Sequence, residues 1–333
     1  MNRLLVAVAA SAVLAGASHV ISAQTPAARK WTVPRLPDGR PDLQGTWTTQ
    51  TFTPLQRPER YAGREFLTDE EAAALTKLLT QPGVNPLGRA VFGAQDHERQ
   101  KETQQSDPTH YDNAVWLATT RPKALSSRRT SLIVDPSNGR LPPLTEAGKK
   151  LAAERQASVG FDSHKNRPLQ ERCVVWTHEG PPMVPPAYND ILRIFQTPQH
   201  VAVVRELSTN LPRIIPTDGR PHTSARIRQW AGSSVGRWEG DTLVVETKHY
   251  NDTVAVQGAT GGVHVLERFT RVSENEIRYR FTVTDPAMWT APWTVELPMM
   301  QTEGVLFEYG CHEGNHDLEN ILRIARAAEQ TGR

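Results

Sequence analysis

Hydrophobic and polar residues alternate along much of the second half of the chain, as expected for β-strands with one solvated face. Ile277, Tyr279, Phe281 and Val283 stand at every second position, and arginine or threonine fills each position between them. Because successive side chains of a strand point to opposite faces, this pattern predicts a strand. Similar segments predict strands at residues 191–196, 201–207, 211–216, 242–247, 264–272, 276–284, 293–297 and 305–309.

These short strands predict a mostly β fold. Neighbouring strands are separated by only a few turn residues, which favours antiparallel pairing. Many short antiparallel strands form a barrel or a strongly curved sheet. A few peripheral helices are predicted to begin at Thr68, Thr145 and about Asn315, where capping residues precede helical patterns.

The first residues have the character of a signal peptide. Arg3 precedes an apolar run over residues 4–17, and Ala23 ends a suitable cleavage site. The run is shorter than the roughly 20 apolar residues that span a bilayer. We therefore predict a signal peptide over residues 1–23 and a periplasmic or secreted protein. Residues 24–333 are predicted to form a single β-rich domain with an elaborated N-terminal half.

Composition restricts the classes of partner. The chain carries 38 basic and 36 acidic residues, a formal net charge of +2. Nucleic-acid binding normally requires a basic stripe, so a nucleic-acid partner is not expected, and no later segment is apolar enough to predict a membrane partner. A phosphate loop, a dinucleotide fingerprint and a Gly-x-Ser-x-Gly elbow are absent, and no cofactor is predicted. The expected partner is a small-molecule ligand or substrate; the oligomeric state is left open.

The chain has two cysteines, Cys173 and Cys311. In an exported protein they are expected to form a disulfide, and the alternative is two separate buried thiols. A His-Glu-Gly triplet follows each cysteine, at residues 178–180 and 312–314. A disulfide would therefore draw both triplets into one neighbourhood.

The triplet after Cys311 precedes the last predicted helix. We predict His312 as a proton-transfer group and Glu313 as its partner, because a helix N-terminus favours negative charge and a carboxylate can orient an imidazole ring. Asn315 is predicted to contribute to substrate binding. Alternatively, Glu313 and Asn315 only cap the helix and His312 is a packed surface ring.

A metal site is a competing prediction. His178, His312 and His316, together with Glu179 or Glu313, would supply enough ligands if the disulfide forms. Their spacing matches no zinc motif, since His-Glu-x-x-His is absent. The leading prediction is therefore a site without metal.

An Asp-Gly-Arg-Pro-His turn carries further candidates. Arg220 is predicted to clamp a carboxylate and His222 to act as acid or base, and the alternative is an ordinary turn with a solvated histidine. Trp230 is predicted to line an aromatic pocket, although tryptophan is more often part of a core. A rigid proline-rich connector is predicted to hold Tyr188 and Asn189 at its far end.

Two carboxylates are predicted to point into the fold and to contribute to ligand binding. If Phe269 faces the core, strand alternation places Glu267 beside it, and Val244 has the same relation to Glu246. A carboxylate inside a barrel is either paired with an arginine or serves as a catalytic acid. The paired, structural role is favoured, and the catalytic role stays open.

Several of these residues belong to longer motifs. RIIPxDGRPH at residues 213–222, GxWEGDTLVVET at residues 236–247 and CHEGN at residues 311–315 resemble those of a family of exported proteins of soil bacteria. The resemblance spans residues 34–326 and implies export and a shared scaffold, but no particular reaction. Gly45-Thr46-Trp47 also resembles the first-strand signature of lipocalin-like barrels, which implies that Trp47 closes one end of a barrel.

The leading function hypothesis is an exported, cofactor-independent enzyme, a lyase, isomerase or hydrolase, that acts by general acid–base chemistry on a small hydrophobic or aromatic molecule. Its predicted catalytic residues are His222, His312 and Glu313, and its predicted substrate-binding residues are Arg220, Tyr188, Asn189, Trp230, Glu246, Glu267 and Asn315. A periplasmic binding protein for an apolar ligand and a metal-dependent hydrolase are the alternatives. A strongly shifted pKa inside a pocket would favour the enzyme, and a dry apolar pocket would favour the binding protein.

Overall fold

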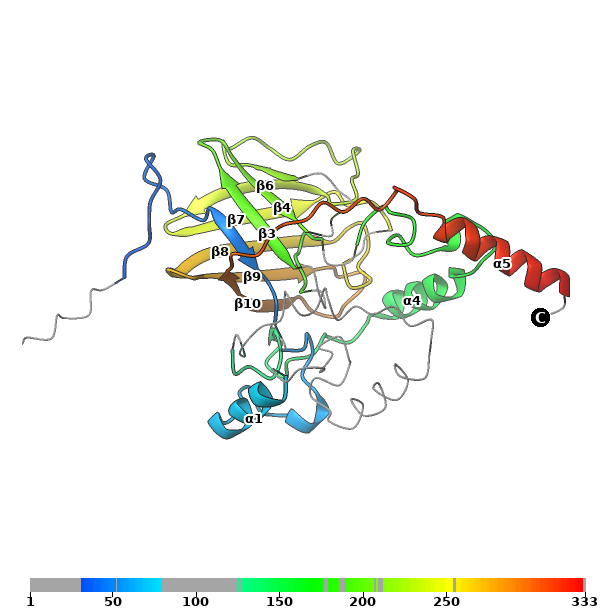
Figure 1. Cartoon of the computed structure of the whole chain (residues 1–333), viewed down its shortest axis with the longest axis horizontal. Coiled ribbons are helices and arrows are strands. Elements are labelled where there is room, and N and C mark those ends of the chain that lie inside the picture. Colours follow the sequence, from blue (N-terminus) through cyan, green and yellow to red (C-terminus); the bar gives the residue numbers. More distant parts are fainter. Residues whose placement is uncertain are drawn as a thin grey trace, which may run out of the picture. The chain divides into compact units, whose positions relative to one another are not determined.

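The alternating segments pair into one antiparallel sheet (Figure 1). A computed structural model describes residues 31–51, 53–79, 125, 127–176, 179–185, 190–206, 208, 212–253 and 256–331. Within these residues the sheet has ten strands: β1 (Gly45–Thr48), β2 (Ile133–Asp135), β3 (Ile191–Gln196), β4 (His200–Arg205), β5 (Arg213–Pro216), β6 (Ser233–Glu239), β7 (Thr242–Lys248), β8 (His264–Ser273), β9 (Glu276–Thr284) and β10 (Trp293–Gln301).

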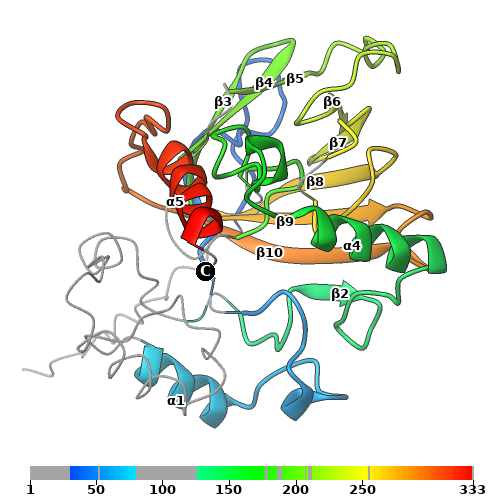
Figure 2. The ribbon, with the colours of Figure 1, turned by 90° about the vertical axis from the view of Figure 1, so that its right-hand side faces the viewer.

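The sheet curves into a nearly closed barrel (Figure 2). Its strand order is β5-β4-β3-β1-β10-β9-β8-β7-β6, and β2 pairs with β10 outside this path. The two edge strands approach each other, because a Cβ atom on Gly236 in β6 would lie 3.0 Å from Ile215 in β5. The predicted mostly β, antiparallel, lipocalin-like barrel is therefore confirmed.

One end of the barrel is closed by Trp47. The β3–β4, β6–β7 and β8–β9 hairpins all turn at this end. Trp47 is fully buried and its indole N–H donates to the carbonyl of Leu43 at 3.0 Å. The guanidinium of Arg271 lies over the Trp47 ring and donates to the carbonyl of Asp42. Trp47 thus occupies the place that the resemblance to lipocalin-like barrels implies.

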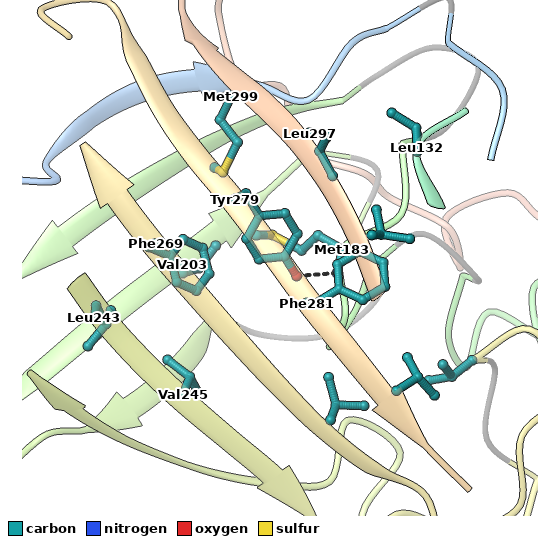
Figure 3. Packing of buried hydrophobic residues seen from close by; sticks show 14 of the residues in the cluster. Leu132, Met183, Val203, Leu243, Val245, Phe269, Tyr279, Phe281, Leu297 and Met299 are labelled. Atoms are coloured by element: carbon teal, nitrogen blue, oxygen red, sulfur yellow. Dashed lines mark hydrogen bonds between the residues drawn. The ribbon is translucent and has the colours of Figure 1, made fainter. Parts of the chain in front are cut away.

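Large apolar side chains fill the interior (Figure 3). In β9 every second residue is buried, and the ring of Tyr279 lies 4.8 Å from that of Phe269 and 5.5 Å from that of Phe281, between centroids. Burial of one such side chain stabilises the fold by about 1.5–3 kcal/mol. The alternation read from the sequence is therefore the pattern that builds the core.

Helices lie outside the sheet. They are α1 (Asp69–Leu79), α4 (Glu146–Ser158) and α5 (Asp317–Thr331), with short 3-10 turns at Glu59–Tyr61 and His164–Asn166. The predicted capping box is present, since Thr68 and Glu71 each accept a hydrogen bond from the other's backbone N–H. Thr145 caps α4 by accepting from Gly148 N at 2.9 Å.

One predicted strand is absent, and one observed strand was not predicted. Residues 305–309 do not form a strand, and Val305 and Phe307 are exposed. Conversely, β6 was not predicted, because its residues show no clean apolar alternation; it forms by pairing with β7 along its whole length.

The chain divides into the units Met1–Thr32 and Val33–Arg333. Nearly all of the first unit, including the predicted signal peptide, lies outside the described residues.

Candidate functional site

The end of the barrel away from the Trp47 plug holds charged side chains in its interior. Strand alternation places Glu267 beside Phe269, as predicted, and its side chain is fully buried. Arg213, at the start of β5, points inward like Ile215 and forms an ion pair with Glu267. Arg213 Nη1 donates to Glu267 Oε1 at 2.9 Å. A buried charge pair of this kind stays in the core only when both partners are satisfied.

Two buried tyrosines attach a proline-rich segment to this polar layer. Tyr279 Oη donates to Glu267 Oε1 at 2.7 Å. It accepts from Met183 N at 2.9 Å (Figure 3). Tyr250 Oη donates to the carbonyl of Pro181 at 2.9 Å. Burial, with the nearby charge of Glu267, raises the pKa of both tyrosines well above its usual value. Both phenols are therefore neutral, and they hold the segment at this end of the barrel.

Arg205 and Asp190 belong to the same layer. Arg205 ends β4 and points inward like Val203, and its Nη2 donates to Thr49 Oγ1 at 3.2 Å and to the carbonyl of Val184 at 3.3 Å. Asp190 accepts from Thr48 Oγ1 at 2.7 Å. Burial raises the pKa of Asp190 to about 7, although Thr48 and the charge of Arg205 act against this. Burial also lowers the pKa of Arg205, to about 10, so Arg205 remains charged.

A cavity of about 510 Å³ opens beside the seam between β5 and β6. This volume lies in the range typical of small-molecule sites. Its polar lining consists of Glu179, Arg205, Ser208, Arg213, Gln229 and Ser234, and its apolar lining includes Met183, Val203, Pro212, Ile214 and Ala231. The cavity is therefore neither dry nor purely apolar.

His222 is part of a charged cluster on the outer face of the barrel. Its Nε2 lies 3.0 Å from Glu246 Oε2, and its Nδ1 lies 2.9 Å from the carbonyl oxygen of Ser233. Both ring nitrogens are therefore engaged by oxygen atoms of the protein. His264 Nε2 and Lys248 Nζ bind Glu246 Oε1 at 2.8 and 2.9 Å.

Glu246 does not point into the barrel as predicted. Leu243 and Val245 on the same strand belong to the core, so alternation turns Glu246 outward. Val244, which motivated the prediction, is buried but on the outer side. Burial alone would raise the pKa of Glu246, but hydrogen bonds from Lys248 and His222 hold this pKa at about 2. Glu246 thus anchors the loop between β5 and β6 through His222.

Two further predicted residues lie away from the cavity lining. Arg220 forms an ion pair with Asp218, two residues before it. Trp230 is half-buried, and its neighbours Gln229 and Ala231 line the cavity while Trp230 does not.

The two cysteines lie together, as predicted. Cys173 and Cys311 lie at disulfide distance, with their Cα atoms 5.8 Å apart. Asn315 Nδ2 donates to the carbonyl of Cys311 at 3.0 Å and contacts Cys173 Sγ at 3.3 Å. His312 and Glu313 are exposed, and neither is among the described residues that line the cavity.

The His-Glu-Gly triplet at residues 178–180 contributes Glu179 to the cavity wall. Glu179 is buried and lines the cavity; its Oε1 accepts from Trp176 N at 2.9 Å and its Oε2 from Ser208 Oγ at 3.2 Å. His178, Tyr188 and Asn189 lie outside the described residues. In the part of the chain that the structure describes, no group of three or more His, Cys, Asp or Glu side chains could hold a metal ion. His316, the third histidine of the alternative metal set, is exposed.

Arg205, Arg213 and Asp190 were not predicted from the sequence as site residues. A signal was present, because Arg205 continues the inward series of Val201 and Val203. An arginine at an inward position of a strand indicates a buried charge, and a buried charge requires a partner or a ligand.

Comparisons with protein-family models, with curated proteins and with solved structures found no match to this chain. The resemblance to exported proteins of soil bacteria therefore stays a prediction. Among the described residues, no helix has the length and apolar character needed to cross a membrane.

Proposed function

We propose that this protein is an exported barrel that binds a small organic molecule in the cavity beside the β5–β6 seam. The cavity itself carries this proposal: it joins an apolar wall at Met183 and Val203 to the buried charge of Arg205 and to the paired charge of Arg213. Apolar walls with a few placed polar groups are the usual composition of a ligand site. A buried arginine that has no ion-pair partner among the described residues would be a costly way to fill a core that had no ligand to recognise.

Binding in the cavity is tested with matched variants. The probes are benzoate, phenylacetate and octanoate with their uncharged amides, measured by isothermal titration calorimetry. Ala231→Trp fills the cavity, and Ala202→Trp places the same bulk on the outer face of β4. We expect at least one probe to bind the native protein and the Ala202→Trp control, and none to bind Ala231→Trp. Binding that survives Ala231→Trp, or no binding by any probe, contradicts the proposal.

An acid–base enzyme is the second candidate, and Asp190 favours it. A carboxyl group with a pKa of about 7 is suited to exchange protons near neutral pH, and Asp190 lies close enough to Arg205 at the cavity for their charges to interact. The catalytic roles of His222, His312 and Glu313 stay predictions. His222 has both ring nitrogens engaged, and the other two side chains are exposed beside the cysteine pair.

Proton transfer is tested by deuterium exchange. The native protein and Asp190→Asn are incubated in deuterated buffer with small aromatic ketones, and exchange next to the carbonyl is followed by NMR; p-nitrophenyl esters test hydrolysis in parallel. The enzyme hypothesis expects exchange or hydrolysis that Asp190→Asn abolishes. Equal rates with both proteins, or with no protein, contradict it.

Export rests on the signal-like residues 1–23 and on the cysteine pair. Mass spectrometry of protein from the periplasm or medium of its producing cell is expected to find Gln24 at the N-terminus. Protein that retains residues 1–23 and stays in the cytoplasm contradicts export.

A further inference from the structure

From Arg205 we infer that the ligand of the seam cavity is a small organic acid, whose carboxylate binds the Arg205 guanidinium while its apolar part lies against Met183 and Val203. This inference deepens the proposed binding function and rests on it. It assigns a chemical class to the ligand and a recognition role to an arginine that the sequence did not single out.

The first observation is the incomplete hydrogen bonding of Arg205. The residue is only 7% exposed. Its Nη2 has acceptors at Thr49 and Val184, whereas its Nε and Nη1 are buried and have no hydrogen-bond partner among the described residues. A guanidinium has five N–H donors and no acceptor, so the group that satisfies the others must bring acceptor atoms.

The second observation is the charge around Arg205. Arg213, the other arginine in the cavity wall, is already neutralised by its ion pair with Glu267. Glu179, in the same lining, accepts from Trp176 N and Ser208 Oγ, and its charge acts on Arg205 from beyond ion-pair distance. Within the described residues, no carboxylate lies within ion-pair distance of Arg205. Arg205 is therefore the cation in the cavity whose charge an incoming anion can match.

Asp190 balances the charge of Arg205 only in part. Among the carboxyl groups, Asp190 acts most strongly on the charge of Arg205, and burial raises the pKa of Asp190 to about 7. Near neutral pH a large share of Asp190 is protonated, and the bound anion would keep it so. A protonated Asp190 offers a donor and no opposing charge.

The third observation is the apolar wall, which favours an organic acid over an inorganic ion. Met183, Val203 and Pro212 line the same cavity as Arg205. At about 510 Å³ the cavity is far larger than a phosphate or sulfate ion needs. A carboxylate on an aromatic or short aliphatic body matches both parts of the lining, because the carboxylate meets Arg205 and the apolar body meets the apolar wall.

The test separates charge recognition from binding itself. Each acid probe is compared with its isosteric amide against the native protein, Arg205→Gln and Arg193→Gln. Arg193 is an exposed arginine on the outer face of β3 and serves as the matched control. We expect the native protein and Arg193→Gln to bind the acid about tenfold more tightly than the amide, and Arg205→Gln to lose this preference.

The outcomes are distinguishable. If acid and amide bind the native protein equally, the inference fails while the proposed binding function stands; if neither binds, the proposed function fails. Displacement of the acid by inorganic phosphate at similar concentration overturns the organic-acid class. Should Arg205→Gln not fold, the Nε–H signal of Arg205 in the native protein is followed by NMR during titration with the acid. A shift with slowed hydrogen exchange supports the inference, and an unchanged signal overturns it.

Discussion

Arg213 and Glu267 form an ion pair inside the barrel although their strands, β5 and β8, are not neighbours in the sheet. The guanidinium of Arg213 also donates to Ser234 Oγ on β6 and Thr247 Oγ1 on β7, at 3.0 and 3.1 Å. Arg213 therefore links one edge strand to the other edge of the open sheet. It contributes to closure where the backbone ladder between β5 and β6 is missing.

This pair is expected to stabilise the fold only as a unit. Glu267→Gln or Arg213→Met alone leaves one buried charge unpaired and is expected to lower the free energy of unfolding by about 3–5 kcal/mol. The double variant removes both charges and should recover much of that loss. Urea denaturation of the four proteins measures the coupling.

The exposed Arg268–Glu239 pair provides the control for that cycle. Its removal should change the free energy of unfolding by less than about 1 kcal/mol. Single-variant losses at positions 213 and 267 that simply add in the double variant would show that the two side chains do not act together.

The inward direction of Glu267 could be predicted from the sequence, but its partner could not. Direction follows from the two-residue period of β8, which is local information. Arg213 meets Glu267 only because the sheet curves until its edges approach, and curvature depends on the twist summed over all the strands. The cavity beside the seam has the same origin, which explains why Arg205 and Asp190 were not predicted as site residues.

Local signals were reliable where local energetics decide the structure. The reciprocal cap of Thr68 and Glu71 and the cap by Thr145 each form within one helical turn. Local sequence signals failed where pairing with another strand decides the structure. Residues 305–309 have strand-like alternation but pair with no strand among the described residues, whereas β6 has weak alternation and a complete partner in β7. The inward direction predicted for Glu246 was wrong, because Val244 is buried on the outer side of the sheet.

Asp190 is expected to make stability depend on pH. Burial raises its pKa from 3.8 to about 7 in the folded protein, so between these values the folded state keeps a proton that the unfolded state releases. The contribution of Asp190 is fully present below the unfolded pKa and is lost as the pH rises through about 7. Relative to the native protein, Asp190→Asn should therefore gain stability, by a few kcal/mol, between about pH 4 and pH 8.

The groups around this carboxyl, Thr48, Arg205 and Glu206, are the same in the native protein and in Asp190→Asn. The difference between the unfolding free energies of the two proteins therefore isolates Asp190. Chemical denaturation at several pH values measures this difference. Asp241→Asn, at an exposed position, is the control and should show a difference that is nearly constant with pH. A constant difference for Asp190→Asn as well would contradict the raised pKa of Asp190.

Glu246 is expected to show the opposite sign. Its folded pKa of about 2 lies below its ordinary value of 4.5, so its stabilisation is present above pH 4.5 and is lost as the pH falls toward 2. Glu246→Gln weakens the bonds to His222, His264 and Lys248 and should cost about 1–3 kcal/mol at neutral pH. Glu239→Gln, which affects only exposed ion pairs, is the matched control.

Glu246 holds the loop between β5 and β6 through His222. The Glu246→Gln substitution should therefore destabilise this loop as well as the whole fold. Backbone amides of residues 223–232 are expected to exchange hydrogen faster in Glu246→Gln than in Glu239→Gln. Equal exchange in the two variants would indicate that the loop is held without Glu246.

The cysteine pair is expected to secure the C-terminal segment more than the barrel. Every residue from Thr302 to Thr331 is at least partly exposed, so this segment has little buried surface to hold it in place. Cys311 connects it to the buried Cys173, 138 residues earlier in the chain. The double variant Cys173→Ser/Cys311→Ser should lose up to about 4 kcal/mol of unfolding free energy in the chain-entropy model.

Limited proteolysis of that variant should cut first between residues 302 and 331, leaving a resistant barrel. A reductant should reproduce this in the native protein and leave the double variant unchanged, whereas simultaneous cleavage of segment and barrel would show that the pair supports the whole fold.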